Sequence, residues 1–407
     1  MNVGDLNPSW NDWKNWLRDE PLPVAAVYLP ALDENISRIR TLAEQAGKPL
    51  RVASKSVRCV EALRRIFAKG NGVFQGLMCF AVPEAAKLAD EGFTDLLVAY
   101  PTIQPADLAL ATDLAARDVG FKLVVDSEQH LEALAAAARE QGVTIDVVLE
   151  LDVSLRAARG HVHLGARRSP LREAEQIEAL ARHAAQLEGV RVVGLMGYEA
   201  QIAGVPDRSP FDRWMNPLKV AMKAASRPDV HRRRGEAVAA LARAGVEVQV
   251  VNGGGTGSLE STGRDTSVTE LTAGSGFYCS HLFSYFYSID LIPAAFFASQ
   301  VVRSSDPDLI TCAGGGYIAS GPVSADKQPI PWRPEGLKAV AMEGAGEVQT
   351  PLDRTGCNEY IQNGDPIIFR HAKAGELCER FNHLLLIGPN GVENRVPTYR
   401  GQGWAFF

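Results

Sequence analysis

The sequence predicts an α/β protein in which a (β/α)8 TIM-type barrel is followed by a C-terminal β domain. Two observations predict this fold. Short, mostly apolar runs recur eight times over residues 50–271, and an Ala- and Leu-rich amphipathic stretch follows most of them. After Leu282 the helical periodicity fades, and Gly-, Pro- and Val-rich strand-like pieces take over. Apolar runs that alternate with helices indicate a parallel sheet covered on its faces.

The elements follow in order along the chain. Residues 23–29 are typical of a strand, and apolar residues at helical spacing predict a helix from Asp33 to Ala46. The eight barrel runs, of which the last is the weakest, are 50–53, 73–77, 96–99, 121–125, 145–151, 190–196, 246–251 and 268–271. Eight repeats over about 230 residues favour a closed barrel. An open doubly wound sheet is the alternative, because the pattern does not show closure.

The β domain is predicted from four strand-like pieces. They lie at residues 296–302, 309–313, 366–369 and 384–387. We therefore predict three parts of the chain. Residues 1–30 form an N-terminal segment that contributes partly to the β domain, residues 31–285 form the barrel, and residues 286–407 form the β domain.

Charge and hydropathy exclude several classes of partner. The formal net charge is -6 and the pI about 5.8, so neither nucleic acid nor an anionic membrane is expected to bind. Basic clusters at residues 167–168 and 232–234 are interpreted as solvated faces or helix ends. No apolar run approaches the ~18 residues that span a bilayer, and the polar N-terminus lacks a signal layout. Six widely spread cysteines fit free thiols in a reducing compartment, so a cytoplasmic protein is expected.

A lysine at a strand end is the first candidate for chemistry. The active site of such a barrel lies at the C-terminal ends of its strands, and the first barrel strand runs directly into Lys55. A lysine that points into a barrel mouth loses solvation, and its amine becomes a nucleophile able to form an imine. An ordinary ion pair is the alternative for Lys55 taken alone.

Two loops of small residues follow the seventh and eighth strands, at residues 253–258 and 273–278. Glycines let backbone N–H groups converge on an anion, and Thr256 and Ser258 add hydroxyl donors. Barrels often bind phosphate after strand seven, although a bare glycine turn is the alternative. Two such loops beside a strand-end lysine suggest a phosphorylated aldehyde cofactor.

Other strand ends carry polar or aromatic side chains whose roles stay open. Gln75 lies at the end of the second run. The ring of Tyr198 suits packing on a planar cofactor, and the Arg156 guanidinium suits a substrate carboxylate or the pyridine side of such a cofactor. For each of them, a wall residue without a chemical role is the equal alternative. Glu150 and Asp152 share one face of a strand, with a structural ion pair as the alternative.

The β domain contains one candidate metal site. Glu376 and Cys378 lie two residues apart, so a strand would place both on one face, with His371 across a short turn. Carboxylate, thiolate and imidazole together suit Zn²⁺, Mn²⁺ or Mg²⁺. No C-x-x-C or H-E-x-x-H spacing accompanies them, so the absence of a metal is the alternative.

These pieces together resemble fold-type III pyridoxal-phosphate enzymes, and within them the D-threonine aldolase and D-serine dehydratase group, whose barrel is of the alanine racemase N-terminal type. The matching stretches are residues 24–35, 51–58, 194–199, 253–258, 274–278, 364–382 and 395–401. Single motifs are loose, but their order and spacing span nearly the whole chain.

The resemblance implies pyridoxal 5'-phosphate held as a Schiff base on Lys55, the catalytic residue, with the cofactor as electron sink for the bonds at Cα of a small amino-acid substrate. The glycine loops would hold the phosphate, and Tyr198 would lie near the ring. The implied cofactor-binding residues are Lys55, Gln75, Arg156, Tyr198, Gly254, Gly255, Thr256, Gly257, Gly274, Ser275 and Tyr278. A homodimer is also implied.

The group usually carries a His-x-Cys or His-x-Asp metal pair in its β domain, and this chain departs from it. Aligned on Asn382, the pair becomes Glu376 and Cys378, with His371 displaced. The activity implied is a lyase that cleaves or dehydrates a β-hydroxy D-amino acid. One alternative is a racemase of the alanine racemase type, whose second base would be a tyrosine such as Tyr317 or Tyr360. Another is a single-barrel cofactor carrier, which the β domain disfavours.

Overall fold

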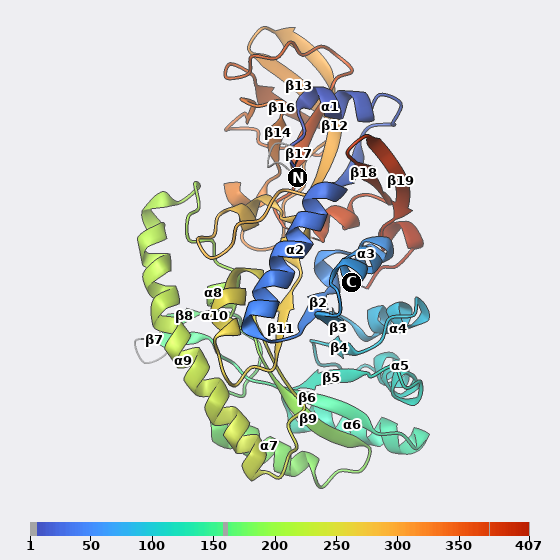
Figure 1. Cartoon of the computed structure of the whole chain (residues 1–407), viewed down its shortest axis with the longest axis vertical. Helices are drawn as coiled ribbons and strands as arrows, with labels where there is room; N and C mark the ends of the chain where they lie inside the picture. Colours follow the sequence, from blue (N-terminus) through green and yellow to red (C-terminus); the bar gives the residue numbers. More distant parts are fainter. Residues whose placement is uncertain (1–5, 158–161, 374, 407) are drawn as a thin grey trace.

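The computed structural model describes residues 6–157, 162–373 and 375–406. In this part of the chain, eight parallel strands close into a barrel in the order β10-β11-β2-β3-β4-β5-β6-β9 (Figure 1). The strands are β2 (Leu50–Ala53), β3 (Phe74–Cys79), β4 (Leu96–Val98), β5 (Lys122–Val125), β6 (Ile145–Glu150), β9 (Val190–Gly197), β10 (Val250–Gly253) and β11 (Glu270–Ala273). The predicted barrel is confirmed, and the open sheet is excluded.

Helices follow the barrel strands and surround them. They are α2 (Leu29–Ala46), α3 (Val60–Lys69), α4 (Val82–Asp90), α5 (Pro105–Ala116), α6 (Glu128–Gln141), α7 (Ala174–Ala184), α8 (Ala200–Ala203), α9 (Asn216–Arg243), α10 (Leu259–Gly263) and α11 (Ser275–Tyr278). Helix α6 shows why such segments fold locally. The Ser127 hydroxyl accepts a hydrogen bond from the His130 N–H, apolar residues recur at helical spacing, and Gly142 ends the helix in the left-handed region at φ 66°.

The barrel strands separate two cores, because successive side chains on a strand point to opposite faces. Val98 and Leu123 point outward and join the large core shared with the helices. Leu97, Val124 and Val148 belong to a smaller buried cluster that fills the barrel. A closed barrel with a packed interior leaves only its strand ends free to form a site.

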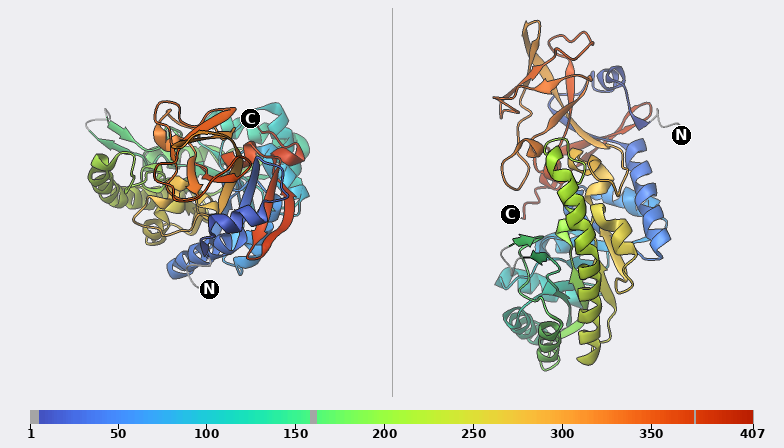
Figure 2. Two further views of the ribbon diagram at one scale, coloured as in Figure 1. Left: turned by 90° about the horizontal axis from the view of Figure 1, so that it is seen from above. Right: turned by 90° about the vertical axis from the view of Figure 1, so that its left-hand side faces the viewer.

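A second sheet lies at one end of the elongated molecule (Figure 2). Among the described residues it has nine strands, with the path β15-β16-β13-β12-β1-β18-β19 and with β17 pairing β12 and β14. The strands are β1 (Val24–Tyr28), β12 (Ala295–Asp306), β13 (Leu309–Ala313), β14 (Ile330–Arg333), β15 (Lys338–Ala339), β16 (Gln349–Asp353), β17 (Pro366–Arg370), β18 (His383–Gly388) and β19 (Gly391–Pro397). The exact domain boundaries stay a prediction.

The N-terminal segment packs on this sheet and links it to the barrel. Helix α1 (Trp10–Trp16) places Trp13 edge-on against Phe296, at 5.2 Å between ring centroids. Strand β1 pairs antiparallel with β12 and parallel with β18, and α2 begins at the next residue. The Asn35 amide then donates to the Ile292 carbonyl at 2.7 Å and accepts from the Ile292 N–H at 2.8 Å. These bonds fix the barrel against the sheet.

Several predicted element boundaries shift. The first helix begins at Leu29 instead of Asp33, because Pro30 suits the first turn of a helix. The second barrel strand extends through Cys79 instead of ending at residue 77, and the seventh begins at Val250 instead of residue 246.

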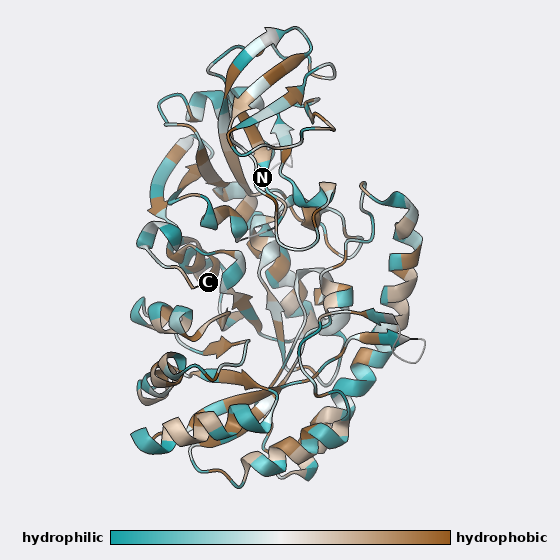
Figure 3. Ribbon diagram, turned by 180° about the vertical axis from the view of Figure 1, so that it is seen from behind, coloured by the Kyte–Doolittle hydropathy of each residue, from teal (hydrophilic) through white to brown (hydrophobic). Residues whose placement is uncertain are grey.

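Figure 3 shows mostly hydrophobic residues along the barrel strands and alternating hydrophilic and hydrophobic residues along the surrounding helices. Two of the basic residues interpreted as solvated are buried. Arg234 is 0% exposed and Arg233 5%, because α9 packs this face on the barrel, so within residues 232–234 the interpretation holds only for Arg232. In the described ranges, no helix has both the length and the apolar character needed to cross a bilayer.

Candidate active site

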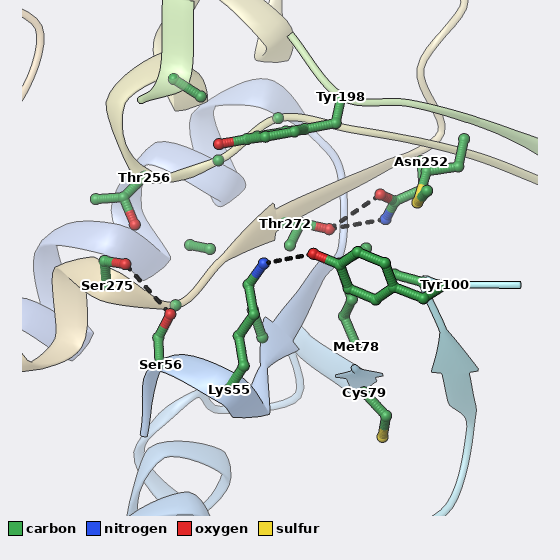
Figure 4. A pocket seen from close by; sticks show the side chains of 18 of the residues that line it. Lys55, Ser56, Met78, Cys79, Tyr100, Tyr198, Asn252, Thr256, Thr272 and Ser275 are labelled. Carbon is green, nitrogen blue, oxygen red and sulfur yellow. Dashed lines mark hydrogen bonds between the residues drawn. The ribbon is translucent and has the colours of Figure 1, made fainter. Parts of the chain in front are cut away.

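A pocket of about 670 Å³ opens at the C-terminal ends of the barrel strands (Figure 4). Lys55 enters it from the turn after β2, Tyr100 from the loop after β4, and Tyr198 from the end of β9. The turns after β10 and β11 complete the wall with residues 254–256 and 274–275. Both glycine loops and the strand-end lysine predicted from the sequence therefore lie around one cavity.

Lys55 is held by its neighbours on a single 3-10 turn, Ser54–Ser56. The Ser54 hydroxyl donates to the Met78 carbonyl at 2.9 Å, which ties the turn to the end of β3. The Arg58 guanidinium donates to the Lys55 carbonyl at 3.0 Å. With the backbone fixed on both sides, the lysine side chain extends into the pocket, and its amine lies 3.4 Å from the Tyr100 hydroxyl oxygen.

The two glycine turns lie side by side and leave no room for side chains. A Cβ at Gly255 would lie 2.9 Å from Cβ of Ala203, and a Cβ at Gly274 would lie 2.8 Å from the carbonyl oxygen of Ala53. Thr256 bridges the turns, because its hydroxyl accepts from the Gly276 N–H at 3.0 Å. Bare backbone with adjacent hydroxyl groups is the chemistry that binds a phosphate.

Hydroxyl groups from three segments converge at this cradle. The Ser56 hydroxyl, from the lysine turn, lies 3.2 Å from the Ser275 hydroxyl. Figure 4 shows the Thr256 hydroxyl on the same side of the pocket. A phosphate bound here would therefore have hydroxyl donors from the first, seventh and eighth strand ends.

A buried carboxylate supports the first glycine turn from beneath. Glu199 is 1% exposed and accepts from the Gly254 N–H at 3.2 Å and from the Ser258 hydroxyl at 2.8 Å. The Thr262 hydroxyl also donates to Glu199, and the buried Arg234 guanidinium forms an ion pair with it. This network fixes the turn before any ligand binds, and it uses Ser258 for support instead of for an anion.

Two aromatic rings and one guanidinium form the opposite wall. The Arg168 guanidinium lies 5.0 Å from the ring centroid of Tyr100 and 5.2 Å from that of Tyr198. Arg168 also donates to the Glu150 carboxylate at 3.3 Å. Burial raises the pKa of Glu150 to about 6 and the pKa of Tyr198 to about 12, in both cases against the positive charge of Arg168.

Sequence reasoning missed Tyr100 and Arg168. A signal for Tyr100 was present, since it directly follows the third predicted run and is therefore a strand-end residue like Lys55. Arg168 was interpreted as solvated, but it lines the pocket. Its position depends on the path of the loop after β8 (Val162–Leu164), which no local pattern predicts.

Residues 27–281 match the protein family described as alanine racemase, N-terminal domain. The chain belongs to this family. Membership implies pyridoxal phosphate as the cofactor of the pocket, in agreement with the fold-type III resemblance of the sequence.

Two curated relatives and one solved structure are similar to the chain. It is 28% identical to D-threonine aldolase of Arthrobacter sp over 260 residues, 62% of each protein. It is 26% identical to 3-hydroxy-D-aspartate aldolase of Paracoccus denitrificans (strain Pd 1222) over 253 residues, 62% of this chain and 59% of that protein. The chain thus matches about three fifths of these relatives. A D-threonine aldolase from Filomicrobium marinum shares the fold, with TM-score 0.81 and 21% identity over 96% of this chain and 97% of that one.

The residues of the pocket fit the cofactor that the family implies. Lys55 supplies an amine for an aldehyde, and Gly255 and Gly274 are positions where a Cβ would clash. The hydroxyls of Ser56, Thr256 and Ser275 lie around the same cradle. The ring of Tyr198 faces the space between Lys55 and the turns (Figure 4).

Four predicted cofactor contacts lie outside this pocket. Gln75 is exposed near the start of β3, where its side-chain amide donates to the Gly72 carbonyl. The strand continues for four residues beyond Gln75, so Gln75 does not lie at the strand end that faces the pocket. Arg156, on β7 (Leu155–Ala157), pairs with Asp152 at 2.7 Å, as the structural alternative predicted. Tyr278, the last residue of α11, is 0% exposed and does not line the pocket. A Cβ at Gly257 would face Phe286 and not the cavity. None of these four residues lines the pocket.

The predicted metal site is also not formed. The Glu376 carboxylate accepts from the Ser320 N–H at 2.9 Å, whereas Cys378 donates to the Val57 carbonyl at 3.3 Å. His371 is 0% exposed, and burial lowers its pKa to about 3. The segment that begins at Glu376 is a 3-10 turn and not a strand. The side chains of Glu376 and Cys378, two residues apart, therefore point in different directions. Among the described residues, no three His, Cys, Asp or Glu side chains are grouped to hold a metal.

Proposed function

We propose that this protein is a pyridoxal-phosphate-dependent lyase that acts on β-hydroxy D-amino acids. The observation that carries the proposal is the convergence of the Lys55 amine, the two bare glycine turns and the Tyr198 ring on one pocket. The matched curated relatives support the reaction class, since one is a D-threonine aldolase and the other a 3-hydroxy-D-aspartate aldolase. Neither is a racemase, so the racemase alternative is less well supported.

Pyridoxal phosphate, once bound, supplies the electron sink that weakens the bonds at Cα of an amino acid. Lys55 would hold it covalently, and residues 254–256 and 274–275 would bind its phosphate. Tyr198 would pack against the cofactor ring, and the Arg168 guanidinium beside the Tyr198 ring would hold that ring in place. The Glu199 network keeps the first turn in place without any ligand, which lowers the entropic cost of binding.

We assign no step to a divalent metal, because Glu376 and Cys378 contact different parts of the chain. In aldol cleavage the substrate's β-hydroxyl loses its proton and the Cα–Cβ bond breaks, whereas in elimination Cα loses its proton and the Cβ–O bond breaks with release of the hydroxyl as water. The products distinguish the two, since cleavage gives an aldehyde and glycine and elimination gives a keto acid and ammonia.

The test compares wild type with Lys55→Ala, and with Lys87→Ala as an exposed lysine control. Wild type and Lys87→Ala are expected to show a visible cofactor band that borohydride removes, and Lys55→Ala to lack it. D-threonine, D-serine and D-3-hydroxyaspartate are then assayed for aldehyde, glycine, keto acid and ammonia. Absence of the band after addition of pyridoxal phosphate would refute cofactor attachment, and exchange of Cα hydrogen with loss of chirality in alanine would indicate a racemase.

We further propose a cytoplasmic homodimer. All six cysteines are free thiols, which suits a reducing compartment. Trp214, on the 3-10 turn before α9, and Leu218, in the first turn of α9, are 81% and 60% exposed, and large exposed apolar side chains of this kind are typical of an interface. Light scattering of the purified protein at micromolar concentration is expected to give twice the 44.0 kDa mass of the chain; a monomer mass would refute the dimer.

A further inference from the structure

The hydroxyl of Tyr100 lies beside the amine that would hold the cofactor. Lys55 Nζ donates to it at 3.4 Å and lies 5.6 Å from the centroid of its ring. Figure 4 shows the hydroxyl pointing at the amine across the pocket. A substrate's amino nitrogen takes the place of the lysine nitrogen on the cofactor, so the Tyr100 hydroxyl lies next to the bonds that react.

Two cations favour the ionised form of this phenol. Burial of Tyr100 raises its pKa, but the charges of Lys55 and Arg168 outweigh burial, and its pKa lies below the ordinary value although Glu150 acts in the opposite sense. Arg168 also donates to the Tyr100 oxygen at 3.4 Å from the loop after β8. A phenol with a lowered pKa, adjacent to the reacting nitrogen, has the properties of a general base.

Aldol cleavage, the first of the two proposed reactions, needs such a base, because the β-hydroxyl must lose its proton. His371, Glu376 and Cys378 do not supply one to this pocket, and none of them lines it. Of the other titratable groups at this wall, Glu150 is paired with Arg168, and burial raises the pKa of Tyr198 to about 12. Tyr100 is therefore the side chain of this chain best placed for proton transfer.

We propose that Tyr100 is a catalytic residue that accepts the β-hydroxyl proton of the substrate. This role rests on the lyase function proposed above. As the Tyr100 phenolate takes the proton, the O–H electron pair forms the carbonyl bond of the leaving aldehyde. The Cα–Cβ bond breaks, and its electron pair stays on Cα, stabilised by pyridoxal phosphate. Tyr100 gains one proton from the hydroxyl, and Cα needs one proton to give glycine, so protons and charge balance over the reaction.

The first experiment removes only the hydroxyl. Tyr100→Phe keeps the ring beside Lys55, so its borohydride-sensitive cofactor band is expected to equal that of wild type. Its kcat with D-threonine or D-3-hydroxyaspartate is expected to fall about 100-fold or more, with KM changed less than about threefold. Tyr285→Phe is the matched control. Tyr285 packs against Phe211 and His281 outside the pocket, and its loss is expected to leave kcat unchanged.

The second experiment measures the phenol itself and does not require turnover. The tyrosinate absorbance of purified wild type minus that of Tyr100→Phe is expected to titrate below about pH 10, the ordinary value for tyrosine. The corresponding difference for Tyr285→Phe is expected above it, because burial raises the pKa of Tyr285. Arg168→Met is expected to move the Tyr100 transition to higher pH, because the charge of Arg168 lowers the pKa of this phenol.

The outcomes separate the two proposals. If wild type turns over a β-hydroxy D-amino acid and Tyr100→Phe has the same kcat, the Tyr100 assignment is overturned and the lyase function stands. If the difference titration shows no early ionisation, the assignment is also overturned. If wild type turns over none of these substrates, the lyase function fails first, and the β-hydroxyl role fails with it even where the phenol titrates early.

Discussion

Gly375 of the β domain lies directly against the backbone of Lys55, since a Cβ at Gly375 would be only 2.0 Å from the Lys55 carbonyl oxygen. Three residues later, Cys378 donates to the Val57 carbonyl at 3.3 Å. The next residue, Glu379, forms an ion pair with Arg58. The β domain therefore contacts the turn that carries Lys55 on the side away from the pocket. The site thus depends on both parts of the chain.

Gly375→Ala is expected to disturb this contact. The variant places a methyl group on the Lys55 carbonyl and should lower the free energy of unfolding by about 3 kcal/mol, through overpacking and left-handed strain together. Gly403→Ala is the matched control, because the two glycines have φ of 74° and 75° and a Cβ at Gly403 meets nothing within 4 Å. Its free energy of unfolding should fall only through the left-handed strain, by about 1–2 kcal/mol. Equal losses in urea unfolding would contradict the contact.

Gly255→Ala is expected to weaken cofactor binding. The added methyl would lie 2.9 Å from Ala203 Cβ and 3.1 Å from Cε2 of Tyr198, so the turn must move away from the phosphate position. The dissociation constant of pyridoxal phosphate should rise about tenfold or more, which corresponds to ~1.4 kcal/mol. Gly235→Ala, in α9 with nothing within 4 Å, should leave it unchanged. Absorbance titration of the cofactor measures both.

Arg51→Met is expected to destabilise the barrel strongly. Arg51 is 1% exposed and donates to the Glu270 carboxylate at 2.7 Å and to Asp95 at 2.9 Å. Removing the guanidinium leaves a buried carboxylate without its counter-charge, at a cost of about 3–5 kcal/mol. Arg191→Met removes a surface pair with Asp146 and should cost less than about 1 kcal/mol. Urea unfolding measures the free energy of unfolding of both variants. Similar losses of stability would show that the burial of the Arg51 ion pairs does not matter.

Glu84 is expected to make stability depend on pH. It is 0% exposed, accepts from the Phe80 N–H at 2.7 Å and from the Tyr399 hydroxyl at 3.1 Å, and burial raises its pKa to about 7. An unfolded chain loses this proton near pH ~4.3. Between these values the folded state keeps a proton that the unfolded state lacks, so stability falls as pH rises, by about 3 kcal/mol in total.

Glu84→Gln should abolish this part of the pH dependence. Urea unfolding at pH 5, 6, 7 and 8 is expected to show the variant gaining stability relative to wild type up to about pH 7 and no further. Glu260→Gln, an exposed carboxyl on α10, is the control and should run parallel to wild type. A Glu84→Gln curve parallel to wild type would refute the raised pKa.

Local pattern was enough to predict the barrel, the β domain and the segments that carry the pocket. Strand and helix periodicity is a property of neighbouring residues, so eight apolar runs predicted eight barrel strands. Lys55 follows the first of them, and bare glycine turns follow the last two. Each of these features depends only on residues close in sequence, and parallel strands in a barrel bring their ends together without further information.

Only the tertiary structure decided which side chains meet. A two-residue change in the end of β3 moved Gln75 out of the site, and one 3-10 turn separated Glu376 from Cys378, because side-chain direction changes with backbone geometry. Tyr100 and Arg168 meet Lys55 through loops whose paths follow from packing. The contact of Gly375 with Lys55 joins residues 320 positions apart, and such contacts exist only once both parts of the chain have packed together.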